Sequence, residues 1–273
     1  MNSPVTAVRV HAVEGERALE RPDRLVTEEP MEIRVQAPGA EAVPLAVTMR
    51  TPGSDFELAV GFCLTEGVID GPQDLASVAY CLSGQGPQEY NVVTVGVRRP
   101  VEVRARNFVA NASCGLCGKT TLDDVAVRCD PVAAGPRVAG SILTALPDRL
   151  RARQAAFAAT GGLHAAARFD SDGELLAIRE DVGRHNALDK LIGHAALDGA
   201  LPRRDEILLV SGRISFEIVQ KAAIAGFPIL CAVSAPSSLA VEAANRFEQT
   251  VVGFLRDGRF NVYSGADRID MSA

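Results

Sequence analysis

Two cysteines spaced for sulfur chemistry stand near the middle of the 273-residue chain. Cys114 and Cys117 form a Cys-x-x-Cys pair, flanked by Gly115 and Gly118 and followed by Lys119. The thiolate is the nucleophilic form of cysteine, and nearby positive charge and backbone N–H groups favour it. The pair therefore predicts chemistry at sulfur: metal binding, thiol–disulfide exchange or transfer of a persulfide sulfur.

These three uses differ in what else they require. A structural zinc site needs four ligands, and the sequence has no second Cys-x-x-Cys to complete it. A thioredoxin-like redox site places the motif at a strand-to-helix junction, whereas this pair lies in the Gly- and Pro-rich segment 107–140. A sulfur relay needs an accessible thiol on an exposed loop, which this segment suits best. Spacing alone leaves all three uses open.

Two turns in the second half of the chain are suited to bind an anion. Ser211, Gly212 and Arg213 follow a predicted strand at 207–210 and precede a predicted helix, so that backbone N–H groups and a guanidinium converge. A serine-rich turn at 234–238 follows the next predicted strand in the same way. If these strands are parallel neighbours, both turns lie at the sheet edge where α/β proteins bind ligands.

Two arginines on the predicted C-terminal hairpin, Arg256 and Arg259, add positive charge to that edge. Together with the turns they predict a nucleotide or another multiply phosphorylated ligand, although the chain contains neither a P-loop nor a Gly-x-Gly-x-x-Gly element. His185 lies in the crowded segment 181–186 at a predicted helix start and is a further candidate for this site. His164 stands in a predicted strand and is expected to be half-buried.

The predicted elements that position these groups change character along the chain. Residues 1–106 are predicted to form a smaller strand-rich domain with one helix, which begins at a capping box made by Ser54 and Glu57. Residues 107–140 form the connecting loop with the cysteine pair, and 141–273 alternate strands with helices. We therefore expect an α/β fold, a layered sheet with helices on both faces.

The periodicity and the turn residues give expected bounds for most elements. Strands are predicted at 5–13, 31–36, 44–49, 75–82, 90–97, 101–105, 163–169, 174–179, 207–210, 228–233, 250–255 and 259–263. Helices are predicted from residue 54 to a stop at Gly67, and at 143–160, 184–197, 215–225 and 238–247. In the helix at 215–225, Glu217 and Lys221 have the spacing of an i,i+4 ion pair.

Charge and composition exclude several classes of protein. The chain carries 28 Lys and Arg against 34 Asp and Glu, a net charge of -6, and so lacks the basic footprint of a nucleic-acid-binding protein. The N-terminus shows no signal peptide, and no apolar run is long enough to cross a membrane. Four cysteines occur singly and are expected to be free thiols in a reducing compartment. These features predict a cytoplasmic protein.

Six segments, in this order along the chain, resemble the formate dehydrogenase accessory sulfurtransferase (FdhD) family. They are TPG at 51–53, NASCGLCG at 111–118, TGGLH at 160–164, REDVGRHNALDK at 179–190, SGR at 211–213 and FLRDGR at 254–259. The similarity extends over about residues 45–265 and is specific as a set.

The resemblance implies a sulfurtransferase that takes a persulfide sulfur from a cysteine desulfurase. It would pass the sulfur to the molybdenum cofactor, bis-molybdopterin guanine dinucleotide, before the cofactor enters formate dehydrogenase. Cys114 matches the persulfide-bearing cysteine and Cys117 its partner. The matched cofactor-binding stretch comprises Phe254, Leu255, Arg256, Asp257, Gly258 and Arg259, and we expect Ser211, Gly212, Arg213 and His185 to complete the site for this guanine-nucleotide-containing ligand.

The resemblance also implies a cytidine-deaminase-like fold, usually as a homodimer. Deaminase chemistry itself is not supported, because it requires a His-x-Glu and a Pro-Cys-x-x-Cys zinc signature. Here Ser113 stands before Cys114, and His164 is followed by two alanines. No resident metal is predicted. The alternative function is a non-catalytic chaperone that binds the molybdenum cofactor, with the cysteines structural or zinc-binding.

Overall fold

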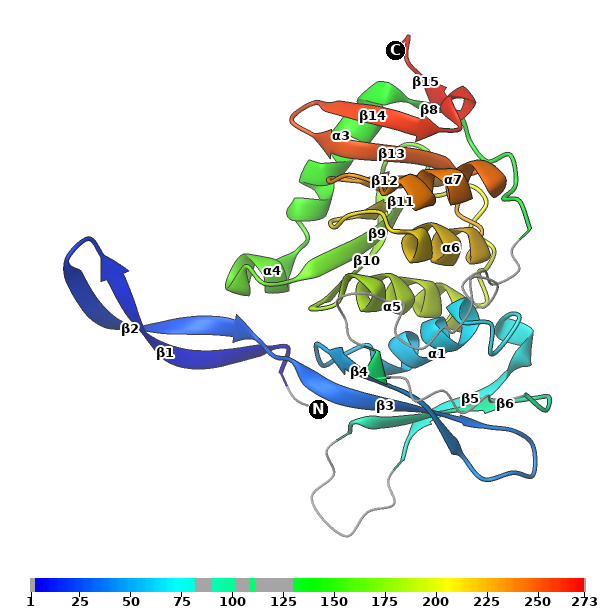
Figure 1. Cartoon of the computed structure of the whole chain (residues 1–273), viewed down its shortest axis with the longest axis horizontal. Coiled ribbons are helices and arrows are strands. Elements are labelled where there is room, and N and C mark those ends of the chain that lie inside the picture. Colours follow the sequence, from blue (N-terminus) through cyan, green and yellow to red (C-terminus); the bar gives the residue numbers. More distant parts are fainter. Residues whose placement is uncertain (1–2, 82–89, 102–108, 111–129, 273) are drawn as a thin grey trace.

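The computed structural model describes residues 3–81, 90–101, 109–110 and 130–272. Within these ranges a six-stranded sheet comes from the C-terminal half of the chain, a five-stranded sheet from the N-terminal part and a two-stranded hairpin from its beginning (Figure 1). A short parallel pair, β8 (Val138–Ala139) with β15 (Ile269–Asp270), joins the C-terminal end to the middle of the chain.

The six-stranded sheet has the order β10-β9-β11-β12-β13-β14. Its strands are β9 (His164–Phe169), β10 (Leu175–Asp181), β11 (Ile207–Val210), β12 (Ile229–Ala232), β13 (Thr250–Arg256) and β14 (Arg259–Ser264). The three central strands β11, β12 and β13 are parallel, and the outer pairs are antiparallel. Every residue of β11 and β12 is buried, as expected for parallel strands covered on both faces.

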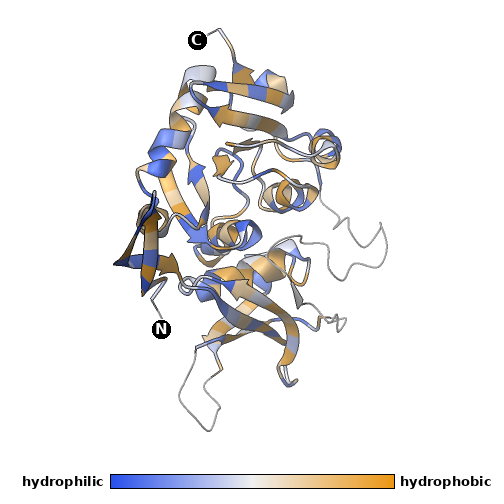
Figure 2. Cartoon of the chain, turned by 60° about the vertical axis from the view of Figure 1, so that its left-hand side comes forward, coloured by the Kyte–Doolittle hydropathy of each residue, from blue (hydrophilic) through white to orange (hydrophobic). Residues whose placement is uncertain are grey.

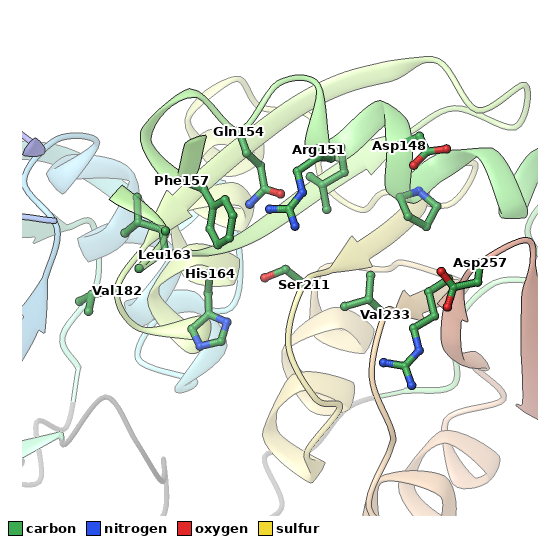
Figure 3. Close-up of a pocket in the computed structure, with 15 residues that line it drawn as sticks. Asp148, Arg151, Gln154, Phe157, Leu163, His164, Val182, Ser211, Val233 and Asp257 are labelled. Carbon is green, nitrogen blue, oxygen red and sulfur yellow. The ribbon is translucent and has the colours of Figure 1, made fainter. Parts of the chain in front are cut away.

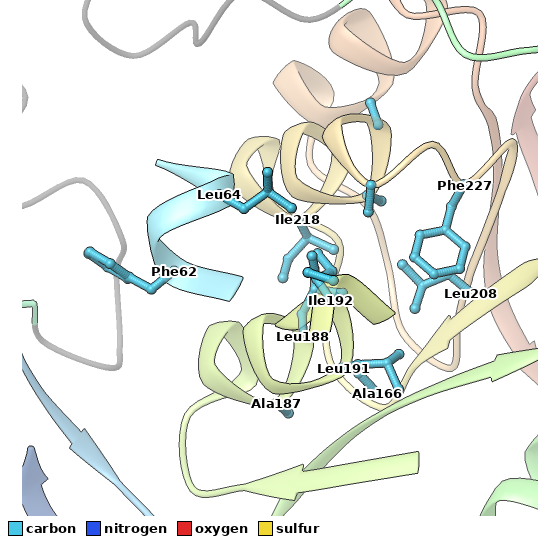
Figure 4. Close-up of a cluster of buried hydrophobic side chains, with 14 of the residues drawn as sticks. Phe62, Leu64, Ala166, Ala187, Leu188, Leu191, Ile192, Leu208, Ile218 and Phe227 are labelled. Atoms are coloured by element: carbon cyan, nitrogen blue, oxygen red, sulfur yellow. The ribbon is translucent and has the colours of Figure 1, made fainter. Parts of the chain in front are cut away.

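Helices cover both faces of this sheet, as the sequence predicts (Figure 1). One face carries α5 (Arg184–Leu197), α6 (Phe216–Ile224) and α7 (Ser238–Arg246), and the other carries α3 (Gly140–Arg151). Alternation along the strands explains the two layers, because successive side chains point to opposite faces. Leu208 packs with α5 and α6 (Figure 4), whereas Ile207 and Leu209 pack in a second cluster with α3.

The N-terminal sheet has the order β5-β6-β3-β4-β7 and supports one helix, α1 (Asp55–Thr65). Its strands are β3 (Glu29–Gln36), β4 (Val43–Arg50), β5 (Leu75–Tyr80), β6 (Val92–Val97) and β7 (Val109–Ala110). The helix α1 packs against α5 so closely that a Cβ atom at Gly61 would overlap the carbonyl oxygen of Asp189, and one at Gly193 would overlap that of Glu57. The glycines therefore permit the contact between the two sheets.

A single cluster of buried side chains spans this contact. It includes Ile33 of β3, Leu58 of α1, Leu188 of α5 and Leu208 of β11. The proposed division into residues 1–106, 107–140 and 141–273 stays a prediction.

The chain begins with an arm, which we define as the hairpin of β1 (Val5–Glu14) and β2 (Arg17–Val26). The arm projects from the body of the molecule (Figures 1 and 2), and its base contacts α4 (Ala155–Thr160). The sequence prediction missed β2, because its ten residues show no apolar alternation and almost all are exposed. Pairing with β1 along ten residues makes it a strand.

Most predicted elements on described residues agree with the structure within a few residues, and α5 and β11 agree in both bounds. Apart from its first residue, the predicted strand at 101–105 lies outside the described residues. The predicted helix at 143–160 was wrong, because the chain turns after Arg151 and forms α3 and α4 separately. The capping box was also wrong: Ser54 has a φ of 55° and its side chain makes no cap bond. Within the described ranges, no helix has the length and apolar character needed to cross a bilayer.

Candidate functional site

A pocket of about 590 Å³ opens where the parallel strands β11 and β12 end (Figure 3). Its walls come from α3 and α4, the turn at 161–164, the ends of β11 and β12, and the tip of the β13–β14 hairpin. Its polar lining consists of Asp148, Arg151, Gln154, His164, Ser211, Arg256 and Asp257. Pockets of this size commonly hold small-molecule ligands, and strand ends in α/β sheets are a common place for them.

The turns after β11 and β12 are joined to each other beyond the sheet. The N–H of Ile214 donates to the carbonyl of Ala235 at 3.2 Å, and the N–H of Ser237 donates to the carbonyl of Ile214 at 3.0 Å. Ser211 is fixed to β9, since its Oγ accepts a hydrogen bond from the N–H of Ala165 at 2.8 Å. The prediction that both turns share one edge is confirmed, because β11 and β12 are parallel neighbours.

The hairpin tip presents part of the predicted segment 254–259 to this pocket. Arg256 and Asp257 line it, whereas the side chain of Leu255 is fully buried in the core. The guanidinium of Arg256 lies 5.7 Å from the ring centroid of Phe254. Phe254, Gly258 and Arg259 do not line the pocket, and a binding role for any residue of this segment stays a prediction.

His164 lines the pocket beside Gly212. Burial lowers its pKa, and the neighbouring charges of Arg184 and His185 lower it further. The imidazole is therefore neutral near pH 7, able both to donate and to accept a hydrogen bond. A Cβ atom on Gly212 would lie 3.5 Å from Nδ1 of His164, so the glycine passes close to the ring. Gly212 and Arg213 themselves do not line the pocket.

His185 belongs to a neighbouring polar group with Ser215 and Glu217 at the start of α6. Its Nε2 lies 3.4 Å from the Oγ of Ser215 and 3.6 Å from Oε2 of Glu217, and Ser215 donates to Glu217 at 2.9 Å. Burial opposes ionisation of Glu217, but the adjacent imidazole of His185 and the hydrogen bond from Ser215 outweigh it and lower its pKa to about 2. His185 does not line the pocket, so the structure does not bring it together with Arg256.

The other polar residues of segment 181–190 tie the two halves of the molecule together. The buried carboxylate of Asp181 accepts hydrogen bonds from the N–H of Thr51 at 3.1 Å and from Nδ2 of Asn186 at 3.1 Å, and pairs with Lys190 at 2.7 Å. The ammonium of Lys190 also donates to the carbonyl of Thr51 at 2.8 Å. These contacts give the crowded segment a structural role, and they fix the Thr51-Pro52-Gly53 segment against it.

The expected ion pair between Glu217 and Lys221 was wrong. Lys221 instead pairs with the buried Asp189 at 2.9 Å and donates to Oγ1 of Thr65 at 2.7 Å. Both partners come from distant parts of the chain, and the helix spacing alone does not reveal them.

Comparison with known proteins places this geometry in a family. The model of the FdhD/NarQ family matches residues 26–270. The chain belongs to the FdhD/NarQ family. A protein named sulfur carrier protein FdhD from Streptomyces coelicolor is 53% identical over 262 residues, covering 93% of this chain and 91% of its own. A protein of the same name from the more distant Sulfurisphaera tokodaii is 41% identical, covering 97% of this chain and 99% of its own.

The fold of this FdhD/NarQ member also matches a solved structure. A crystal structure described as a formate dehydrogenase accessory protein from Desulfotalea psychrophila superposes with a TM-score of 0.76 and covers 98% of this chain and 100% of its own. At 20% sequence identity, this likeness supports the fold.

The cysteine pair on which the sequence prediction rests, Cys114 and Cys117, lies outside the described residues. Among the described cysteines, Cys63 and Cys231 are fully buried, and burial raises the pKa of both thiols far above the ordinary value. Neither is suited to be a thiolate nucleophile. Within the described ranges, no three His, Cys, Asp or Glu side chains gather into a possible metal site.

Sequence reasoning missed one wall of the pocket in this FdhD/NarQ member. Arg151 at the end of α3, Gln154 in the break and Phe157 in α4 line it. A single helix over 143–160 would have spread these residues differently, so the wrong helix prediction concealed them. The only signal in the sequence was their position just before the Thr160–His164 motif.

Proposed function

We propose that this chain is a sulfur carrier that accepts a persulfide sulfur from a cysteine desulfurase and delivers it to the molybdenum cofactor used by formate dehydrogenase. The single observation that carries the proposal is membership in the FdhD/NarQ family over residues 26–270, together with relatives that are named sulfur carrier proteins. The protein acts in the cytoplasm as a homodimer.

Cys114 is the carrier residue in this proposal. Its thiolate attacks the outer sulfur of the donor persulfide, so that a new S–S bond forms at Cys114 as the donor S–S bond breaks. Cys114 then carries the persulfide, and the donor cysteine leaves as a thiolate. Cys117 assists the later release of the sulfur. The burial of Cys63 and Cys231 supports this assignment, because it removes two rival thiols.

The pocket receives the nucleotide part of the cofactor, which is the substrate of the carrier. Arg256 supplies the charge for a phosphate group, and Ser211 and the neutral His164 supply hydrogen-bonding groups at the strand ends. A pocket of about 590 Å³ suits one nucleotide unit of the cofactor.

Mass spectrometry of the intact protein tests the carrier role. After incubation with a cysteine desulfurase and cysteine, we expect the wild type to gain the mass of one sulfur atom, which a reductant removes. Cys114→Ala should gain none. Cys81→Ala is the matched control, since Cys81 is a partly exposed thiol elsewhere in the chain, and it should gain the sulfur as the wild type does.

Failure of the wild type to gain sulfur beside an active desulfurase would refute the carrier role. It would favour the alternative of a cofactor-binding chaperone with zinc-binding or structural cysteines. Stoichiometric zinc that leaves only on unfolding would then support that alternative.

A further inference from the structure

The wall of the pocket formed by α3 and α4 carries three side chains that are not needed to bind a phosphate group. Arg151, Gln154 and Phe157 lie side by side there, and Ser211 and Val233 separate them from Asp257 at the hairpin tip (Figure 3). The pocket is therefore chemically divided, with the arginine of the hairpin at one end and a flat, amide-bearing surface at the other.

Arg151 and Phe157 form the flat surface. The guanidinium carbon of Arg151 lies 4.4 Å from the centroid of the Phe157 ring, which is the geometry of a cation–π stack. Arg151 is exposed, so the outer face of its planar guanidinium remains accessible to a ligand. Guanidinium planes stack readily on heteroaromatic rings, which a lysine ammonium cannot do.

The start of α4 is held in place from the sheet, which makes this surface rigid. The carboxylate of Glu180, on β10, accepts hydrogen bonds from the N–H groups of Ala156 at 3.2 Å and Phe157 at 2.8 Å. The residues facing the pocket are thus positioned before any ligand arrives, which lowers the entropic cost of binding.

Gln154 is the group that points to a ligand. The residue is only 5% exposed and lines the pocket, and its side-chain amide makes no hydrogen bond to another described residue. Although most of the residue is buried, neither polar atom of its amide is sealed inside the protein, so the amide faces the pocket. A ligand in the pocket can therefore exchange hydrogen bonds with both the donor and the acceptor of this amide.

We propose that Gln154 and the Arg151–Phe157 stack bind the ring of a fused heterocycle that carries a lactam edge, an N–H beside a C=O. The amide N–H of Gln154 donates to the ring oxygen and its carbonyl accepts from the ring N–H, while the ring stacks on Arg151. This inference rests on the proposed function, since the cofactor offers two such rings, a guanine and a pterin. The inference assigns recognition of the ring to residues of α3, α4 and the break between them, not to the turns that follow β11 and β12.

Calorimetric titration of the full chain tests this assignment. The probes are GDP, inorganic pyrophosphate and a free oxidised pterin, and the measured quantity is the ratio of the pyrophosphate Kd to the GDP Kd. In the wild type we expect GDP to bind more tightly than pyrophosphate. Arg151→Lys keeps the charge but loses the planar stack, and should reduce the ratio roughly 5- to 150-fold. Gln154→Leu should reduce it about 2- to 12-fold, with pyrophosphate affinity unchanged.

Arg153→Ala is the matched control, because Arg153 is exposed beside the same break but does not line the pocket. It should leave the ratio unchanged. Circular dichroism of each variant checks that it folds. Binding of the free pterin that is lost in Gln154→Leu would identify the pterin as the ring held here; binding of GDP alone would identify guanine.

Two other outcomes separate this inference from the proposed function. If GDP and pyrophosphate both bind, and Arg256→Ala weakens both, an unchanged ratio in Arg151→Lys and Gln154→Leu overturns the ring assignment and leaves the phosphate end intact. If the wild type binds none of the probes, the pocket is not the nucleotide site, and both the ring assignment and the placement of the nucleotide in this pocket are wrong. The sulfur-carrier role is tested separately by the sulfur-loading experiment.

Discussion

Asp181 shows how much one carboxylate can do when it is buried. It has no exposed surface, and it bonds the Thr51 N–H, the Asn186 amide and the Lys190 ammonium at the same time. A buried charge is tolerated only when it is paired and hydrogen-bonded. Loss of this carboxylate would leave the ammonium of Lys190, itself only 2% exposed, without its counter-charge.

Replacement of this carboxylate should therefore be strongly destabilising. We expect Asp181→Ala to lower the free energy of unfolding by about 3–5 kcal/mol, as for other buried pairs with one partner removed. Urea denaturation followed by circular dichroism measures the change. Asp172→Ala, at an exposed position of the β9–β10 turn, is the control and should stay within about 0.5 kcal/mol of the wild type. Equal values for the two variants would contradict a structural role of Asp181.

The lowered pKa of Glu217 predicts that the stability of the fold depends on pH in the acid range. Because its pKa in the folded protein is lowered from 4.5 to about 2, its carboxylate stabilises the fold fully above pH 4.5. That contribution is lost as the pH falls from 4.5 towards 2, where the folded protein also takes up the proton. In unfolding measurements against pH, the advantage of wild type over Glu217→Gln should shrink across this window. A constant difference down to pH 2 would show that the carboxylate is not specially stabilised.

At the scale of elements, the contact between α1 and α5 decides how the two sheets meet. Gly61 and Gly193 face the backbone of the opposite helix, and neither leaves room for a methyl group. Because carbonyl groups rather than flexible side chains occupy the space, the helices would have to move apart to accept one. Overpacking of this kind opposes the helix propensity that alanine would otherwise add.

Substitution at this contact is predicted to be costly in spite of that propensity. Gly61→Ala should lower the free energy of unfolding by about 1–3 kcal/mol or more. Gly140→Ala, at the start of α3, is the control, since its added methyl group would meet its nearest atoms at 3.4 Å, an ordinary contact distance. Thermal unfolding of both variants provides the comparison. If Gly61→Ala were as stable as the wild type, the two helices would pack less closely than described.

At the scale of the whole molecule, the two sheets share one hydrophobic cluster. Residues of β3 and β6 belong to it together with residues of α5, β11 and β12. Ion pairs between residues far apart in the sequence, such as Arg179 with Glu57, also join the two parts. We therefore expect cooperative unfolding despite the strand-rich and α/β character of the two parts.

One cooperative transition is the measurable consequence. The chain has no Trp and three Tyr, and Tyr80 and Tyr90 lie in contact in the N-terminal part. Near-ultraviolet circular dichroism therefore mainly reports on that part, and the far-ultraviolet signal reports on all helices. The two signals should give the same midpoint in urea. Two separate midpoints would instead support independent domains at 1–106 and 141–273.

The sequence by itself determined the elements of the C-terminal half and the edge at which a ligand would bind. The bounds of α5 and β11 follow from local signals, namely apolar periodicity, the glycine at position 199 and a short apolar run typical of a buried parallel strand. In the structure Gly199 has a φ of 64°, which a glycine adopts readily. The same signals placed Ser211 and Arg256 near one sheet edge. The cysteine pair was found by its spacing, and its role stays a prediction.

Only the tertiary structure decided which charged residues meet. Thr51 and Asp181 are 130 residues apart, and Lys221 lies 156 residues from Thr65, so no local pattern predicts either contact. The break after Arg151 and the strand β2 likewise depend on partners: α4 is fixed by Glu180 of β10, and β2 by its pairing with β1. Local conformational preference predicts an element where it coincides with the pattern of buried residues, and elsewhere long-range contacts determine the element.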